Sequence, residues 1–225
     1  MPKNRQNRTR RAEVFTGLIL ILLAISYIAS LLLDFKFVSP DGSPLEDLSY
    51  LSEHIDNQRI SSYSWLITSL LTLIAVPFYI NLFRRKMKVL TYLNGLFMLG
   101  ATIGFLLMAN FGFELRHDMT GILGQALDQV SEQVKLNLFG QFEQEQYYRR
   151  IGSTCVGLFS MGLSLTKFKL KRFPFLSSVL LMVSGPVLIF FNWYDPDHLA
   201  RTGAMAGIII GMAIFCVRLI NKGLA

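Results

Sequence analysis

Long stretches without a charged side chain constrain this chain more than any other feature. Residues 60–83 lie between Arg59 and Arg84, and residues 89–113 lie between Lys88 and Glu114, with no charge inside either run. About 20 apolar residues in a helix cross a hydrocarbon layer about 30 Å thick. Only 16% of the 225 residues are charged, against about 25% in an average soluble domain. The sequence therefore predicts an all-α, polytopic membrane protein.

Six spans are predicted, in one transmembrane domain that covers residues 1–225. Five segments meet the length standard well, namely residues 14–34, 63–83, 89–113, 174–194 and 202–220. The sixth, residues 147–166, is weaker because its uncharged part begins only at Ile151. The first apolar run exceeds the roughly 7–15 residues of a signal peptide, so we expect a retained helix. The outer segments are then residues 35–62 and 114–146.

The distribution of charge predicts the orientation of this bundle. With both termini inside, 15 of the 22 basic residues fall on the inner side and 14 of the 15 acidic residues on the outer side. Cytoplasmic loops carry such an excess of Lys and Arg. If the fourth predicted span, residues 147–166, did not cross the membrane, the four basic residues between Lys167 and Arg172 would lie on the outer side. We therefore expect a multi-pass protein of the cell membrane with six spans and a cytoplasmic N-terminus.

The short basic clusters sit directly against the spans, which favours contact with anionic membrane lipids over nucleic-acid binding. The outer segments are expected to be amphipathic. Ser43-Pro44-Leu45-Glu46 resembles a capping box with proline at the first helical position, and residues 119–134 place their apolar side chains on one helical face. The second helix either caps the bundle or binds a partner protein.

The predicted spans contain no ionisable residue in their cores and no histidine. This pattern argues against proton-coupled pumps, which need a titrating group at depth, and against haem held between histidines. Neutral polar residues remain, and they suit either interhelical hydrogen bonds or the lining of a solute path: Thr68, Ser69, Thr72, Asn81, Asn94, Thr102, Asn110, Ser160, Ser164, Ser184 and Asn192.

The last predicted span carries glycine at every fourth position, at Gly203, Gly207 and Gly211. Such a groove lets another helix approach closely, and that helix belongs either to this chain or to another. Pro77 in the second span and Pro186 in the fifth lie inside apolar runs, where proline kinks or opens a helix.

One weak candidate metal site is visible, formed by His117, Asp195, Asp197 and His198 at the outer ends of two spans. Imidazole and carboxylate groups would suit a divalent cation if the bundle brought them together. The alternative is ordinary turn chemistry around Asp-Pro. No familiar catalytic motif is present. We therefore expect no enzyme activity and no cofactor, with an outer-face, metal-dependent activity as the one exception.

Three stretches carry a resemblance at the level of hydropathy, namely RTRRAEVFTGLILILLAISYIAS, PFYINLFRRKMK and VGLFSMGLSLTKFKLKRFPFLSSVLLMVSG. In this respect the chain resembles small six-span prokaryotic membrane protein families whose function is unknown. The resemblance implies the six-span layout and no residue roles.

The sequence leads to two hypotheses of function. The first is a non-catalytic accessory or interaction subunit of a membrane complex, which binds its partner through residues 119–134 or through the glycine groove at 203–211. The alternative is a channel or facilitator for a small neutral or lipid-like solute, suggested by the two prolines and the neutral polar residues.

Overall fold

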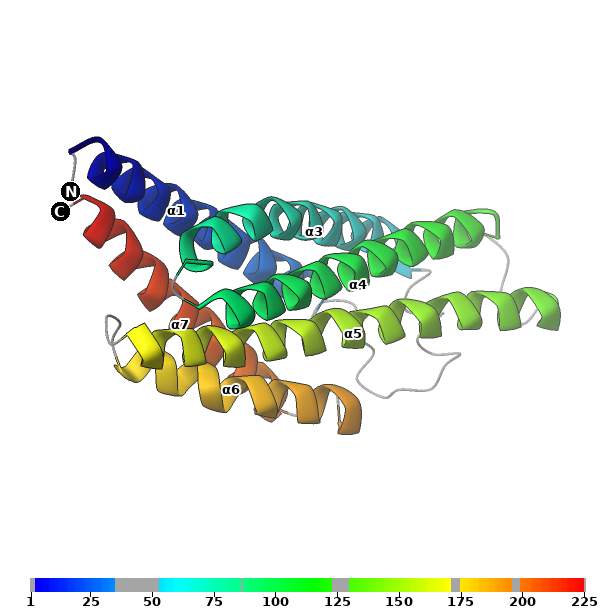
Figure 1. Ribbon diagram of the computed structural model, residues 1–225. Coiled ribbons are helices and arrows are strands. Elements are labelled where there is room, and N and C mark those ends of the chain that lie inside the picture. The colour runs from blue at the N-terminus through cyan, green and yellow to red at the C-terminus, as the bar shows by residue number, and fades with distance from the viewer. Residues whose placement is uncertain are drawn as a thin grey trace.

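The chain folds entirely into helices over the residues that the computed structural model describes, which are 3–34, 53–85, 87–122, 130–170, 175–195 and 199–224. The six helices are α1 (Lys3–Asp34), α3 (Ile55–Phe83), α4 (Lys88–Thr120), α5 (Glu132–Leu170), α6 (Phe175–Tyr194) and α7 (Leu199–Leu224), shown in Figure 1. This confirms the all-α prediction for the described part of the chain. The predicted helix that follows Ser43 lies outside these residues.

In the described part of the chain, five helices are long and apolar enough to cross a membrane, and together they indicate a protein embedded in one. They are α3, α4 and α6 along their whole length, Arg10–Leu33 of α1 and Leu199–Asn221 of α7. Helix α5 is not among them, because charged residues interrupt it as far as Arg150.

The helices form a closed ring. Each packs mainly against two others, in the order α1, α3, α4, α5, α6 and α7, and α7 returns to α1. A close approach joins α4 to α5, where a Cβ on Gly104 would lie 2.7 Å from the backbone nitrogen of Gly152. Because neither residue has a side chain, the two backbones can touch at this level.

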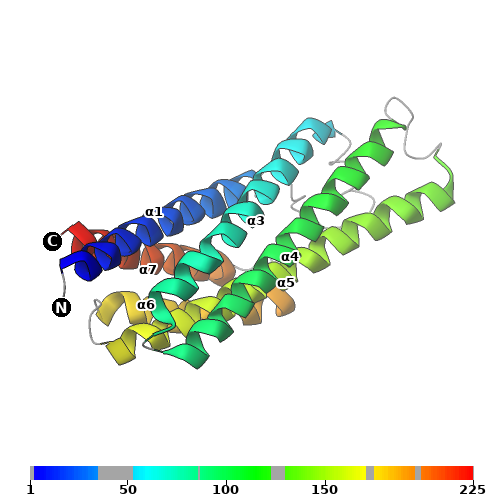
Figure 2. The same cartoon turned by 45° about the horizontal axis from the view of Figure 1, so that its top comes forward.

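Both chain termini lie at one end of the ring, which we call the terminal end (Figure 1). The last turns of α3 and α5 and the first turns of α4 and α6 lie at this end as well (Figures 1 and 2). The basic residues near these turns, such as Arg10, Arg84 and Lys88, are therefore gathered at the terminal end.

At the opposite end, α4 and α5 project together beyond the ends of α1, α6 and α7 (Figure 2). The two helices have 33 and 39 residues, so at 1.5 Å per residue they are about 50 and about 58 Å long. A hydrocarbon layer is only about 30 Å thick. We call the part formed by residues 114–122 and 130–146 the α4–α5 projection.

The ends of the amphipathic helix predicted over residues 119–134 belong to other elements, and its middle, residues 123–129, lies outside the described part of the chain. Helix α4 continues to Thr120, Gly121 and Ile122 form a turn, and α5 begins at Glu132. A small second core, in which Leu115 and Met119 of α4 pack with Leu138 of α5, extends these two helices beyond the ring.

Candidate functional site

The centre of the ring contains a cavity of about 40 Å³. Five of the six helices contribute to its wall, and only α6 does not. The lining residues are Leu23, Ala24, Tyr27, Thr68, Thr72, Met98, Ala101, Phe105, Val156, Phe159, Ile208, Ile209 and Met212. Two small residues, Ala24 and Ala101, leave the space that larger side chains would fill.

Two groups of aromatic side chains flank the cavity along the ring axis. Toward the projection, Tyr27, Trp65 and Phe105 form the Trp65 cluster, with ring centroids 4.5 Å apart for Trp65 and Phe105 and 5.7 Å apart for Tyr27 and Trp65. All three are buried. Aromatic rings at such distances attract one another beyond the effect of burial alone, so the cluster packs tightly beside the cavity.

Toward the terminal end, the second group is the Tyr79 cluster, made of Tyr79, Phe83, Phe159 and Phe215. Ring centroids lie 5.0 Å apart for Tyr79 and Phe83, 5.5 Å for Tyr79 and Phe159, and 6.1 Å for Phe83 and Phe215. The Nδ2 atom of Asn94 donates a hydrogen bond of 2.7 Å to the Tyr79 hydroxyl. This cluster therefore combines packed aromatic rings with buried hydrogen bonds of the Tyr79 hydroxyl, to Asn94 and to Thr166.

The two threonines of the wall turn their hydroxyl groups away from the cavity. Thr68 Oγ1 lies 2.6 Å from Ser26 Oγ and 3.0 Å from Ser30 Oγ, at hydrogen-bond distance from both. Thr72 Oγ1 donates to the Thr68 carbonyl at 2.7 Å. Among the described residues that line the cavity, none exposes a polar atom to it. An apolar cavity of this kind stays free of water.

Many other neutral polar residues join neighbouring helices. Ser164 Oγ donates to the Ser178 carbonyl, and Ser177 Oγ donates to the Gly211 carbonyl, each at 2.7 Å. Asn192 Nδ2 donates to the Arg150 carbonyl at 2.8 Å. These residues connect α5, α6 and α7, which is the role of interhelical hydrogen bonds in membranes. They are used in packing and do not line the central cavity.

A buried charged group lies where the projection leaves the ring. Both carboxylate oxygens of Glu145 accept hydrogen bonds from Gln58 Nε2, at 3.0 and 2.9 Å, and Arg149 lies 3.7 Å away on the next turn of α5. Glu145 is only 2% exposed. A Cβ on Gly112 of α4 would collide with Ser62 Oγ and lie 3.6 Å from the Glu145 carboxyl carbon. We call these residues the Glu145 node.

The three glycines of α7 differ in their surroundings. A Cβ on Gly207 would collide with Ser184 Oγ, and a Cβ on Gly211 would lie 2.8 Å from Leu181, so both glycines face α6 of the same chain. A Cβ on Gly203 would meet nothing within 4 Å. The groove is therefore filled by α6 over two of its three positions. Pro77 and Pro186 lie inside α3 and α6, which continue as helices on both sides.

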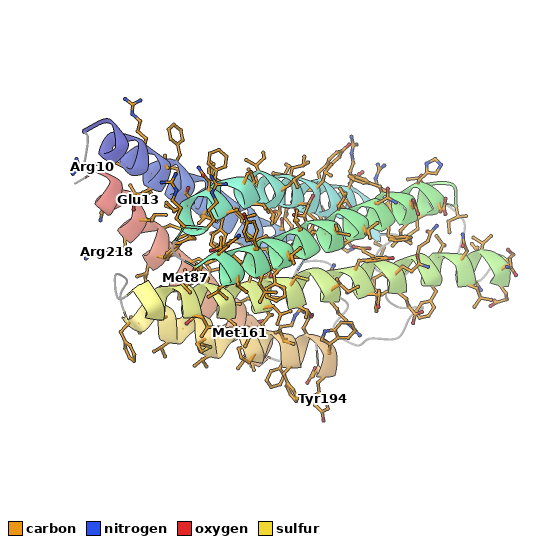
Figure 3. The ribbon with its side chains drawn as sticks, viewed as in Figure 1. Arg10, Glu13, Met87, Met161, Tyr194 and Arg218 are labelled. Atoms are coloured by element: carbon orange, nitrogen blue, oxygen red, sulfur yellow. The ribbon has the colours of Figure 1, made fainter. Side chains whose placement is uncertain are left out.

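The candidate metal ligands are not brought together in the described structure. His117 is exposed in the last turns of α4, within the projection, whereas Asp195 follows the end of α6. Figure 3 labels Tyr194, the residue before Asp195, at an end of α6 that stops well short of the end of α4. Asp197 and His198 lie outside the described residues. No group of three His, Cys, Asp or Glu side chains suited to a metal occurs in the described part of the chain.

Comparisons with protein-family models, with curated proteins and with solved structures give no match for this chain.

Proposed function

We propose that this protein is a six-span membrane protein with both termini in the cytoplasm, and that it serves as a non-catalytic subunit of a membrane complex. The α4–α5 projection is its docking element and binds an α-helix of a partner protein. The observation that carries the proposal is the length of α4 and α5, which exceed the thickness of the hydrocarbon layer by about 20 Å or more at 1.5 Å per residue.

The exposed face of α5 supports this choice of partner. Leu136 is 64% exposed and Tyr147 is 51% exposed, and Gly140 and Glu143 lie between them at helical spacing on the same face. A Cβ on Gly140 would meet nothing within 4 Å, which leaves room for another helix to approach. A hollow in the surface follows this face and is bordered by Phe139, Gly140, Glu143 and Tyr147.

Purification in mild detergent from the native host, with mass spectrometry of the proteins recovered, tests this function. We expect a stoichiometric partner with the native chain and a large loss of that partner with Leu136→Glu, because a charge on the docking face must be desolvated on binding. Val134→Glu is the matched control, since Val134 is exposed and lies nearly opposite Leu136 around the helix.

Two results would contradict the docking proposal. One is recovery of the native chain alone, with no partner in stoichiometric amount. The other is an equal loss of the partner in Leu136→Glu and Val134→Glu, because docking would then not depend on the face that carries Leu136.

A second function, a facilitator for a small neutral solute, is favoured by the central cavity. The cavity lies on the ring axis between the two aromatic clusters, where a solute that crosses through the bundle would pass. Solute flux into liposomes that contain the purified protein distinguishes this function, because a docking subunit gives no flux above that of empty liposomes.

A further inference from the structure

The central cavity has the size and chemistry of a binding site for one very small molecule. Its volume of about 40 Å³ exceeds the roughly 10–15 Å³ that one water requires, and is well below the roughly 150 Å³ of a cavity that binds benzene. A water molecule in the cavity would find no hydrogen-bond partner. It needs two to four polar partners, and the Thr68 and Thr72 hydroxyls already form hydrogen bonds outside the cavity.

The wall is adaptable. Met98 and Met212 contribute flexible, polarizable thioethers, which adjust to the shape of an apolar guest. Along the ring axis, the buried rings of the Trp65 cluster and the Tyr79 cluster lie on the two sides of the cavity.

We propose that this cavity is a binding site for a small apolar molecule of two or three heavy atoms, the size of a dissolved gas. A guest of this kind restores the dispersion contacts that the empty space forfeits, and it needs no hydrogen bond from the wall. The inference depends on the cavity alone and holds whether or not the projection docks a partner.

Xenon is a suitable probe, because it is a single apolar atom that binds in dry protein cavities. The full chain is purified in nanodiscs, and bound xenon is measured by nuclear magnetic resonance over a range of xenon pressures. We expect one saturable signal that nanodiscs without protein lack. Ala101→Leu places a larger side chain in the cavity and should abolish this signal.

Two further variants make the xenon result decisive. Ala206→Leu is the same change on the exposed face of α7 and should keep the native signal. Ala24→Leu fills the cavity from α1 and repeats the test if Ala101→Leu fails to fold, which the thermal unfolding curve of each variant reveals. A native signal that persists in a folded Ala101→Leu or Ala24→Leu variant overturns the proposal, and so does the absence of any protein-dependent signal in the native chain.

Discussion

At the residue scale, the carboxylate of Glu145 is the least expected feature of this protein. It lies buried between three helices and accepts both of its described side-chain hydrogen bonds from Gln58. Carboxylates are almost never fully buried unless they are paired, and a buried charge that loses its partner is costly. The Glu145 node therefore fixes α3 and α5 at one register at the base of the projection.

Glu145→Ala should destabilise the protein by about 1–3 kcal/mol, because the buried Gln58 amide loses its acceptor. The measurement is thermal or denaturant unfolding of the purified chain in one detergent. Glu143→Ala is the control: Glu143 is an exposed carboxylate on the same helix, and a surface change of this kind stays within about 0.5 kcal/mol. Equal stability of the two variants would show that the node contributes nothing.

The sequence contained part of the signal for this node. Glu145 follows Leu138 by seven residues and precedes Gly152 by seven, so all three share one face of α5. Leu138 is fully buried, and Gly152 contacts α4. The pattern was missed because residues 132–146 are mostly polar and resemble a surface segment, and because the partner, Gln58, is distant in the sequence.

At the element scale, the apolar runs predicted the helices well but not where two of them end. The runs at 63–83 and 89–113 lie inside α3 and α4, and the described part of the run at 174–194 forms α6, Phe175–Tyr194. Helices α4 and α5 continue past their apolar runs because Leu115, Met119 and Leu138 pack together, and a hydropathy pattern does not reveal tertiary contacts of this kind. A hydropathy pattern does not reveal the order of the helices in the ring either, because that order depends on which helix faces pack together.

The contact between α6 and α7 leads to a second prediction, in which the same substitution at two glycines changes the unfolding temperature in opposite directions. Gly207→Ala should lower the unfolding temperature, because its Cβ collides with Ser184 on α6 and overpacking costs about 1–3 kcal/mol. Gly203→Ala meets open space and should raise it slightly, because alanine is favoured over glycine inside a helix by about 1 kcal/mol. Unfolding of both variants in the same detergent measures the difference.

A destabilising effect of the same size at both glycines would contradict this prediction. It would mean that Gly203 also contacts a helix, either in a second copy of the chain or in a partner. A stabilising effect at both would mean that α6 and α7 separate easily at Ser184.

At the scale of the whole molecule, the closed ring explains why the central cavity was not predictable. Its size depends on side-chain volumes contributed by five helices, and no single helix carries that information. From the sequence, the neutral polar residues suited either interhelical hydrogen bonds or the lining of a solute path. In the structure, Thr68 and Thr72 do border the cavity but use their hydroxyls in hydrogen bonds elsewhere, so the space itself is apolar.

The number of spans is the last property to test at this scale. In the ring, α1 and α7 pack side by side, and both chain termini lie at the terminal end (Figure 1). If α5 crosses the membrane with the other five helices, the C-terminus lies on the same side as the N-terminus. If α5 stays outside, only five helices cross and the C-terminus lies on the opposite side.

We expect six crossings, so a C-terminal reporter that is active only in the cytoplasm should be active when fused after Ala225. The same reporter inserted between residues 123 and 129 should be inactive, because the projection then lies outside. The basic residues at the terminal end support this orientation, since cytoplasmic segments are enriched in Lys and Arg. If the C-terminal fusion protein is produced at normal levels but its reporter is inactive, only five helices cross the membrane and α5 lies outside the bilayer. Activity of the reporter inserted between residues 123 and 129, in turn, would reverse the orientation and place the docking face in the cytoplasm.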